Sequence, residues 1–392
     1  MNREDRKAVL HRLFQAGVDA VGGQQATARE LSKRQFDKPL HLVAVGKAAD
    51  AMAMGAIEVL DDKLVSGLVL TKHQHLSDPV RLHPKLECHE SGHPVPDENS
   101  LKSGVRLCQF VAAIPADHQL LFLVSGGASA LVEHLDEGLS LEDLKRKTDQ
   151  LLASGAAIGE MNRHRRQISQ IKGGKLAKFL HCQVLQLLIS DVPGDKPQDI
   201  GSGLLVPDET TGMPAELPVW AMIETQIIAS SAIAQAAVND AVEAEGLLVR
   251  QASGSLDGDV AEVRDRIASV VATPDCPSGV YIWGGEPTVQ LPEAPGRGGR
   301  NQHLALSLAD AAAINGKVSL LVCGTDGSDG PTADAGGLVD EQTTTLASQA
   351  SLSIDDYLQN ADAGNCLEAL GLLVTTGPTG TNVMDLAIVI VS

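Results

Sequence analysis

The sequence predicts an α/β protein of two domains, each with a mostly parallel sheet flanked by helices, and with an active-site cleft between them. Three observations favour this class. Short apolar runs typical of strands alternate with longer segments of helical periodicity. Several of the apolar runs end in glycine-dense turns, and 392 residues exceed what one hydrophobic core usually supports. Alternating strands and helices predict mostly parallel sheets with both faces covered.

The N-terminal half carries the first series of elements. Apolar residues recur at helical spacing from Arg3 to about Leu31, which predicts one helix. The run 40–45 predicts a strand that ends in Gly46-Lys47 and leads into an Ala- and Met-rich helix. Further strands are expected at 65–70, 119–124 and 182–189, and helices at 98–112 and in the basic segment 161–175.

The pattern restarts after the turn-rich segment 207–214, which places a domain boundary near Met222. We therefore expect a Rossmann-like N-terminal domain over 1–222 and a second α/β domain over 223–392. The sequence leaves open whether the last strand returns to the first domain. Strands of the second series are expected at 226–229, 247–250, 279–282, 318–322 and 386–391.

Composition excludes several classes of function. A formal charge of -19 with two Trp, two Tyr and five Phe opposes binding to nucleic acid, which needs a broad basic surface or aromatic stacking platforms. Six scattered cysteines without CxxC or zinc-ligand spacing indicate reduced thiols, and we expect neither a signal peptide nor a bilayer-spanning segment. We expect a cytoplasmic enzyme of small molecules without a membrane partner, and a homo-oligomer is left open.

Two turns of the first domain follow predicted strands, where open α/β sheets bind ligands. Lys47 stands at the start of a helix, which attracts anions, although Gly46-Lys47 matches neither the Walker spacing nor GxGxxG. Ser125, Gly126 and Gly127 offer consecutive backbone donors that could form an anion nest. A serine nucleophile is the alternative, but the sequence is not GxSxG.

Carboxylates in similar turns suggest a divalent cation. Asp191 and Asp195 lie four residues apart across Val-Pro-Gly, and Glu286 follows another strand. Magnesium prefers a few carboxylates with water and phosphate oxygens, so these three are candidate metal ligands. Asp326, in the turn 323–330, is a candidate for substrate binding, and the alternative is that it only shapes the turn.

Basic residues near glycines provide candidate anion ligands. Arg297 and Arg300 lie in the segment 296–302 with four glycines, and a guanidinium can bind carboxylate or phosphate with two hydrogen bonds. Arg165 and Lys172 belong to a basic helical segment next to Gly173-Gly174. The alternative for Arg165 and Lys172 is that they belong to a solvent-exposed helix face without a ligand.

Characteristic motifs follow one another along nearly the whole chain. They are VGKAA (45–49), ESGHPVPDENS (90–100), SGGASAL (125–131), IKGGKLA (171–177), SDVPGD (190–195), GGEPTV (284–289), GRGGRNQ (296–302), GTDGSDGPTADAGG (324–337) and TGPTGTNV (376–383). In this combination and order they resemble the glycerate 2-kinase family, whose C-terminal region is called MOFRL and some of whose members are labelled hydroxypyruvate reductase. The resemblance implies ATP-dependent phosphorylation of D-glycerate at its 2-hydroxyl, giving 2-phosphoglycerate, with Mg²⁺.

Residue types and this resemblance together suggest catalytic roles. We expect Lys47 and Arg300 to stabilise charge on the transferred phosphoryl group or to bind the glycerate carboxylate. Asp191 is expected to bind Mg²⁺ or to orient the 2-hydroxyl as a base, and Glu286 and Asp326 are second candidates for such contacts. Two other functions stay open, a nicotinamide-dependent hydroxypyruvate reductase and a non-catalytic sensor of small anions.

Overall fold

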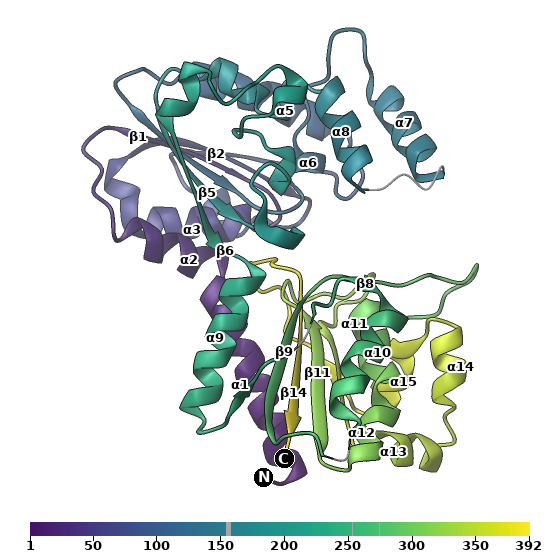
Figure 1. Ribbon diagram of the computed structural model, residues 1–392. Helices are drawn as coiled ribbons and strands as arrows, with labels where there is room; N and C mark the ends of the chain where they lie inside the picture. Colours follow the sequence, from purple (N-terminus) through teal and green to yellow (C-terminus); the bar gives the residue numbers. More distant parts are fainter. Residues whose placement is uncertain (154–157, 253, 274) are drawn as a thin grey trace. The chain divides into compact units, whose positions relative to one another are not determined.

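The chain forms two compact units (Figure 1). The computed structural model describes residues 1–392 except 154–157, 253 and 274. We call Gly22–Ser230 with Gly380–Asn382 the β1–β6 unit, and Met1–Val21, Ser231–Thr379 and Val383–Ser392 together the β7–β14 unit.

This division differs from the predicted domains 1–222 and 223–392. The first helix, α1 (Arg3–Val21), packs against α9 (Ser231–Ala244) and therefore belongs with the C-terminal half. Strand β6 (Ile223–Ala229) pairs with β5 in the N-terminal sheet, so the boundary falls after the strand. The single helix expected over 3–31 is two helices, because the backbone at Gly22 is extended (φ -55°, ψ 132°).

The sheet of the β1–β6 unit is parallel throughout, in the order β3-β2-β1-β4-β5-β6. Helices cover both faces, α2 and α3 on one and α5 on the other (Figure 1). Strands buried on both faces favour apolar side chains at nearly every position, and β1, which is buried throughout, has them everywhere except at His41. Its strands are β1 (Leu40–Val45), β2 (Leu64–Lys72), β3 (Leu86–Ser91), β4 (Gln119–Val124), β5 (Gln183–Ile189) and β6.

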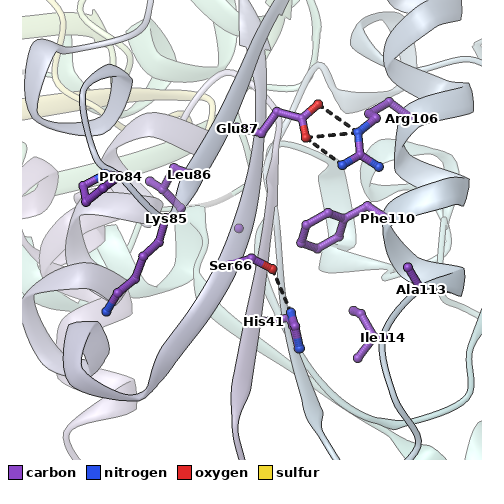
Figure 2. A pocket seen from close by; sticks show the side chains of 11 residues that line it. His41, Ser66, Pro84, Lys85, Leu86, Glu87, Arg106, Phe110, Ala113 and Ile114 are labelled. Carbon is purple, nitrogen blue, oxygen red and sulfur yellow. Dashed lines mark hydrogen bonds and ion pairs between the residues drawn. The ribbon is translucent and has the colours of Figure 1, made fainter.

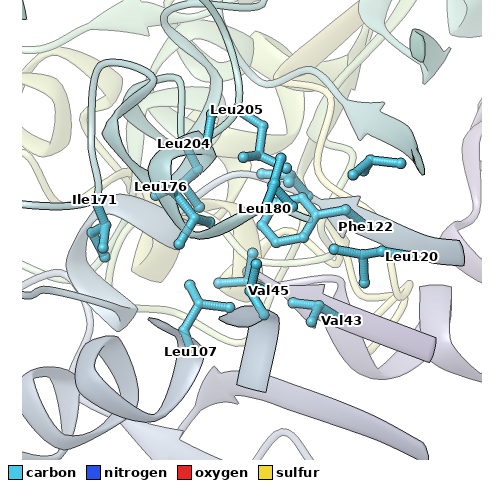
Figure 3. Close-up of a cluster of buried hydrophobic side chains, with 14 of the residues drawn as sticks. Val43, Val45, Leu107, Leu120, Phe122, Ile171, Leu176, Leu180, Leu204 and Leu205 are labelled. Carbon is cyan, nitrogen blue, oxygen red and sulfur yellow. The ribbon is translucent and has the colours of Figure 1, made fainter. Parts of the chain in front are cut away.

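Apolar side chains fill the space between the sheet and α5 (Figure 3). Val43, Phe122 and Leu107 are fully buried in this cluster, with Ile171 and Leu176 from the segment after α8. The helices of this unit are α2 (Gly23–Leu31), α3 (Ala49–Leu60), α4 (Asp78–Arg81), α5 (Glu98–Ala112), α6 (Ala128–Leu131), α7 (Leu141–Ala153) and α8 (Ile158–Ile168).

A buried ion pair lies next to this cluster. The Lys172 ammonium, 1% exposed, donates to Glu133 Oε2, and Glu133 Oε1 accepts from Ser169 Oγ at 2.5 Å and from the His134 backbone N–H at 3.0 Å. Burial lowers the pKa of Lys172, and the Glu133 carboxylate opposes that shift. Lys172, predicted to bind substrate or phosphate, is instead enclosed with a protein carboxylate.

The sheet of the β7–β14 unit is mostly antiparallel, so the prediction of two mostly parallel sheets is wrong for this unit. Its order is β13-β12-β11-β14-β9-β7, and only β7 and β9 pair in parallel. Strand β14 inserts between β9 and β11 and runs against both, and β12 and β13 continue the antiparallel pairing beyond β11. The strands are β7 (Val249–Arg250), β9 (Gly279–Gly285), β11 (Val318–Gly324), β12 (Gly336–Asp340), β13 (Leu373–Val374) and β14 (Asp385–Val391), with β8 (Gly258–Asp259) and β10 (Pro287–Thr288) in a separate pair.

Helices also cover both faces of this second sheet, with α1 and α9 on one face and α10 and α11 on the other (Figure 1). No helix of the described residues is both long and apolar enough to cross a membrane. The remaining helices of the unit are α10 (Val260–Val271), α11 (Arg300–Ser307), α12 (Ala309–Asn315), α13 (Thr343–Gln349), α14 (Ile354–Gln359) and α15 (Ala363–Ala369).

Replacing Lys172 by Met should destabilise the protein by about 3–5 kcal/mol, because it leaves a buried carboxylate without its partner. The double variant Lys172→Met/Glu133→Leu should recover much of that loss. Urea unfolding followed by circular dichroism measures both, with the exposed Lys178→Met as control. A Lys172→Met protein as stable as the wild type would contradict the buried pair.

Candidate functional site

The first group of predicted site residues lies at the carboxyl edge of the parallel sheet. Strand order reverses between the neighbours β1 and β4, since β2 and β3 extend the sheet on one side and β5 and β6 on the other. Crevices at such a reversal are the usual ligand sites of open α/β sheets. Lys47 follows β1 and Ser125 follows β4, so both stand at this point.

The two turns are joined by hydrogen bonds. The Lys47 backbone N–H donates to the Gly126 carbonyl at 2.8 Å, and the Ala48 N–H donates to Ser125 Oγ at 3.0 Å. Gly46, at φ +130°, leaves no space for a side chain because a Cβ there would collide with Ser125. Ser125 is fully buried and its hydroxyl supports the start of α3, which argues against a serine nucleophile.

Lys47 and Asp191 both lie against the glycine turn. The Asp191 carboxylate occupies the place that a side chain at Gly126 would take. A Cβ at Gly127, where φ is +81°, would lie 3.0 Å from Lys47 Cγ. Within the described part of the chain, the Lys47 ammonium has no carboxylate within ion-pair distance. The structure thus brings Lys47, Asp191 and the turn 125–127 together.

The other candidates of this unit are placed differently. Asp195 ends a short 3₁₀ turn, Pro193–Asp195, at φ +51°. Arg165 lies on α8, where burial lowers its pKa and the charge of Glu133 opposes the shift. Among the described residues, no group of three or more His, Cys, Asp or Glu side chains could hold a metal ion.

The second group surrounds Arg300 in the β7–β14 unit. Its Nε donates to Asp385 Oδ2 at 2.6 Å, its Nη2 to Asp385 Oδ1 at 3.2 Å, and its Nη1 lies 2.6 Å from Glu286 Oε1. Gly285, Asp385 and Gly324 are register partners on β9, β14 and β11, so these groups share one edge of the sheet. Glu286 is thus an ion-pair partner of Arg300.

These carboxylates fix the charge and direction of the guanidinium. Burial acts to lower the pKa of Arg300, but Asp385 and Glu286 raise it above its ordinary value on balance. The Arg300 side chain keeps 33% of its surface exposed. A guanidinium carries five N–H donors, so after these contacts it still has donors for a planar oxyanion.

Asp329 caps helix α11 from a distant loop. Its two carboxylate oxygens accept from the backbone N–H groups of Asn301 at 3.0 Å and Gln302 at 2.8 Å. Gly299 permits this approach, because a Cβ there would collide with the Asp329 carboxylate. The positive end of α11 is therefore occupied by a protein carboxylate, and Arg300 starts a helix whose first turn is fixed.

Arg297 and Asp326 take part in structural contacts. Arg297 Nη2 pairs with Asp334 at 2.8 Å and Nη1 with Glu368 at 2.5 Å. Asp326 Oδ1 accepts from the backbone N–H and the hydroxyl of Ser328, both at 3.0 Å. These contacts are those expected if Asp326 stabilises the turn, which was the alternative to substrate binding.

Asp385 and Glu133 were missed by the sequence reasoning. Asp385 directly precedes the apolar run 386–391, and a carboxylate at the start of a buried strand was the only available signal. Glu133 has no motif of its own.

A cavity of about 430 Å³ opens at the opposite, amino-terminal end of the parallel sheet (Figure 2). Its polar groups are matched with one another, since Arg106 forms a forked pair with Glu87 and His41 Nδ1 lies 2.9 Å from Ser66 Oγ. No predicted site residue lines it.

Asp329 should make stability depend on pH. Burial raises its pKa from 3.8 to about 7, although the backbone donors of Gln302 and Asn301 oppose the shift. The folded state then binds the proton more tightly, so this stabilisation is complete below about pH 4 and is lost as pH rises through 7. Urea unfolding at several pH values should show a decline of at most about 1.4 kcal/mol per pH unit from this group. Asp329→Asn should reduce the total decline, part of which comes from Asp385, whose pKa burial raises to about 6, and the same-loop control Asp326→Asn should leave it unchanged.

Comparison with known proteins identifies relatives over almost the entire chain. Residues 9–243 match a family described as a domain of unknown function (DUF4147), and residues 279–385 match the MOFRL family. The D-glycerate 2-kinase of Thermotoga maritima is 38% identical, covering 98% of each chain. A putative hydroxypyruvate reductase of Agrobacterium vitis is 33% identical over 100% of this chain and 95% of its own.

A solved structure agrees with these relatives. The crystal structure of a glycerate kinase from Thermotoga maritima superposes with a TM-score of 0.89 at 36% identity, covering 99% of this chain and 100% of the other. Identity above 30% over nearly the full length, together with both matched families, establishes that the chain belongs to the glycerate 2-kinase family with its MOFRL region.

Proposed function

We propose that this protein transfers the terminal phosphoryl group of ATP to the 2-hydroxyl of D-glycerate, giving 2-phosphoglycerate and ADP. The observation that carries the proposal is the 38% identity with a D-glycerate 2-kinase over 98% of both chains. The two groups of charged residues support it, since both substrates are anions and both groups contain a partly exposed cation.

Lys47 and Arg300 are proposed to stabilise negative charge. Phosphoryl transfer depends more on positioning and charge neutralisation than on covalent chemistry by the protein. Lys47 combines a rigid backbone position with an ammonium that no described carboxylate neutralises. Arg300 is held in direction by Asp385 and Glu286, so its remaining donors are preorganised for an anionic oxygen.

Asp191 is proposed to serve the acceptor hydroxyl or a magnesium ion. Its carboxylate lies directly against Gly126, beside the turn that follows β4. Magnesium commonly binds one or two carboxylates and completes its shell with phosphate oxygens and water, which fits Asp191 better than an all-protein cage. When bound, the ion neutralises charge on the phosphate oxygens.

A nicotinamide-dependent reductase is the second candidate. The strand order 3-2-1-4-5-6 of the parallel sheet is also that of dinucleotide-binding folds, and one relative is named a putative hydroxypyruvate reductase. Against it, the turn after β1 reads Gly46-Lys47-Ala48-Ala49 and lacks the GxGxxG fingerprint.

The reaction itself is tested with ATP, Mg²⁺ and D-glycerate, with products resolved by phosphorus NMR. We expect 2-phosphoglycerate in an amount equal to the ADP formed. Loss of nicotinamide absorbance with hydroxypyruvate, without ADP release from glycerate, would instead support the reductase.

Lys47→Ala and Arg300→Ala should each reduce kcat by about 10²-fold or more, because each removes a preorganised charge from the developing transition state. Steady-state kinetics measure the effect, and circular dichroism checks the fold. Lys178→Ala and Arg264→Ala, an exposed lysine and an exposed arginine of the respective units, are matched controls. Near-normal turnover in both site variants would refute the assigned roles.

A further inference from the structure

We infer that His93 is a substrate-contacting residue of this kinase, which donates an imidazole N–H to an anionic oxygen of ATP or glycerate beside Lys47. The inference rests on the proposed function for the identity of the anion, and extends it by a residue of the motif 90–100 to which no role has been assigned above.

The fold brings His93 to the same turn as Lys47. It lies two residues beyond β3, at the carboxyl edge of the parallel sheet. The position that a Cβ would take at Gly127 lies 3.0 Å from both Cδ2 and Nε2 of His93, and 3.0 Å from Lys47 Cγ. The imidazole of His93 and the side chain of Lys47 therefore both lie next to Gly127, and a side chain at that position would be in close contact with both.

The loop that carries His93 is anchored, while its ring has no hydrogen-bond partner. Asp97 closes the loop by capping α5, with Oδ1 accepting from the Ser100 N–H at 3.0 Å and Oδ2 lying 2.8 Å from His73 Nε2. Among the described residues, none forms a hydrogen bond with either ring nitrogen of His93. His93 is only half-buried, so its ring can be reached from solvent and its nitrogens are available to a bound anion.

The electrostatic surroundings of His93 favour an anion. Burial is the largest cause that lowers its pKa to about 4, and Lys47, Lys72 and His75 lower it further. The imidazole is therefore neutral near pH 7, with one nitrogen that donates and one that accepts. Lys47 and Lys72 bring positive charge to its surroundings, which favours the binding of an anion.

The low pKa of His93 also indicates whether the imidazole acts as a general base or as a hydrogen-bond donor. A general base works best when its pKa lies near the working pH, and a group with a pKa of about 4 accepts a proton poorly. Donation of the neutral N–H to a phosphate or carboxylate oxygen needs no proton transfer. His93 is thus assigned to binding and positioning of the anion.

Histidine NMR of the wild-type protein tests the contact without relying on turnover. With ¹⁵N-labelled histidine, and with His93→Gln used to assign the signal, ATP or D-glycerate should shift the His93 nitrogen resonances. Either ligand should also raise the pKa of His93 by at least one unit, because the anion stabilises the protonated ring. The exposed His181 should remain unaffected.

Steady-state kinetics provide a second test of the His93 contact. His93→Gln should raise the KM for ATP or D-glycerate, or lower kcat, by about 10-fold or more, whereas His181→Gln should not. Unmoved His93 resonances with both ligands, in a wild-type enzyme that phosphorylates glycerate, would overturn the inference. A wild-type protein without kinase turnover whose His93 signal still moves with ATP would refute the proposed function and retain the contact.

Discussion

The close approach of the backbone turns after β1 and β4 is the constraint on which the parallel half of the molecule depends. Gly46 must lack a side chain because Ser125 fills that place, and the Lys47 N–H is held by the Gly126 carbonyl at 2.8 Å. Asp191 then occupies the space that Gly126 leaves free. A larger residue at either glycine would separate the turns and displace the lysine, the carboxylate and the start of α3 together.

Basic residues of similar appearance in the sequence have very different environments. Lys172 is enclosed with Glu133, and Arg297 is shared between Asp334 and Glu368, so both serve structure. Arg300 is also paired, and its side chain keeps 33% of its surface exposed, against 38% for Arg297 and 1% for Lys172. Burial therefore separates Lys172 from the two arginines, whereas neither pairing nor exposure separates Arg297 from Arg300.

Local signals in the sequence were sufficient for most strands and for the positions of Lys47, Asp191 and Arg300. A buried strand needs a continuous apolar run, and the turn after such a run lies at the sheet edge. The direction of a strand could not be predicted in this way, because β14 is apolar at nearly every position and would suit a parallel or an antiparallel sheet. The ion-pair partners of the basic residues could not be predicted either, since Arg300 and Asp385 lie 85 residues apart and only the tertiary fold brings them together.

The division of the β7–β14 unit along the chain has a consequence for biosynthesis. Helix α1 presents Leu10, Leu13 and Phe14 to a core whose other members follow roughly 200 residues later, after the whole of Gly22–Ser230. At translation rates of about 5–20 residues per second, this apolar face stays without its partner for roughly 10–40 s. During that interval the parallel sheet can already form, so a nascent chain carries one folded unit and one exposed amphipathic helix, which is a natural substrate for a ribosome-associated chaperone.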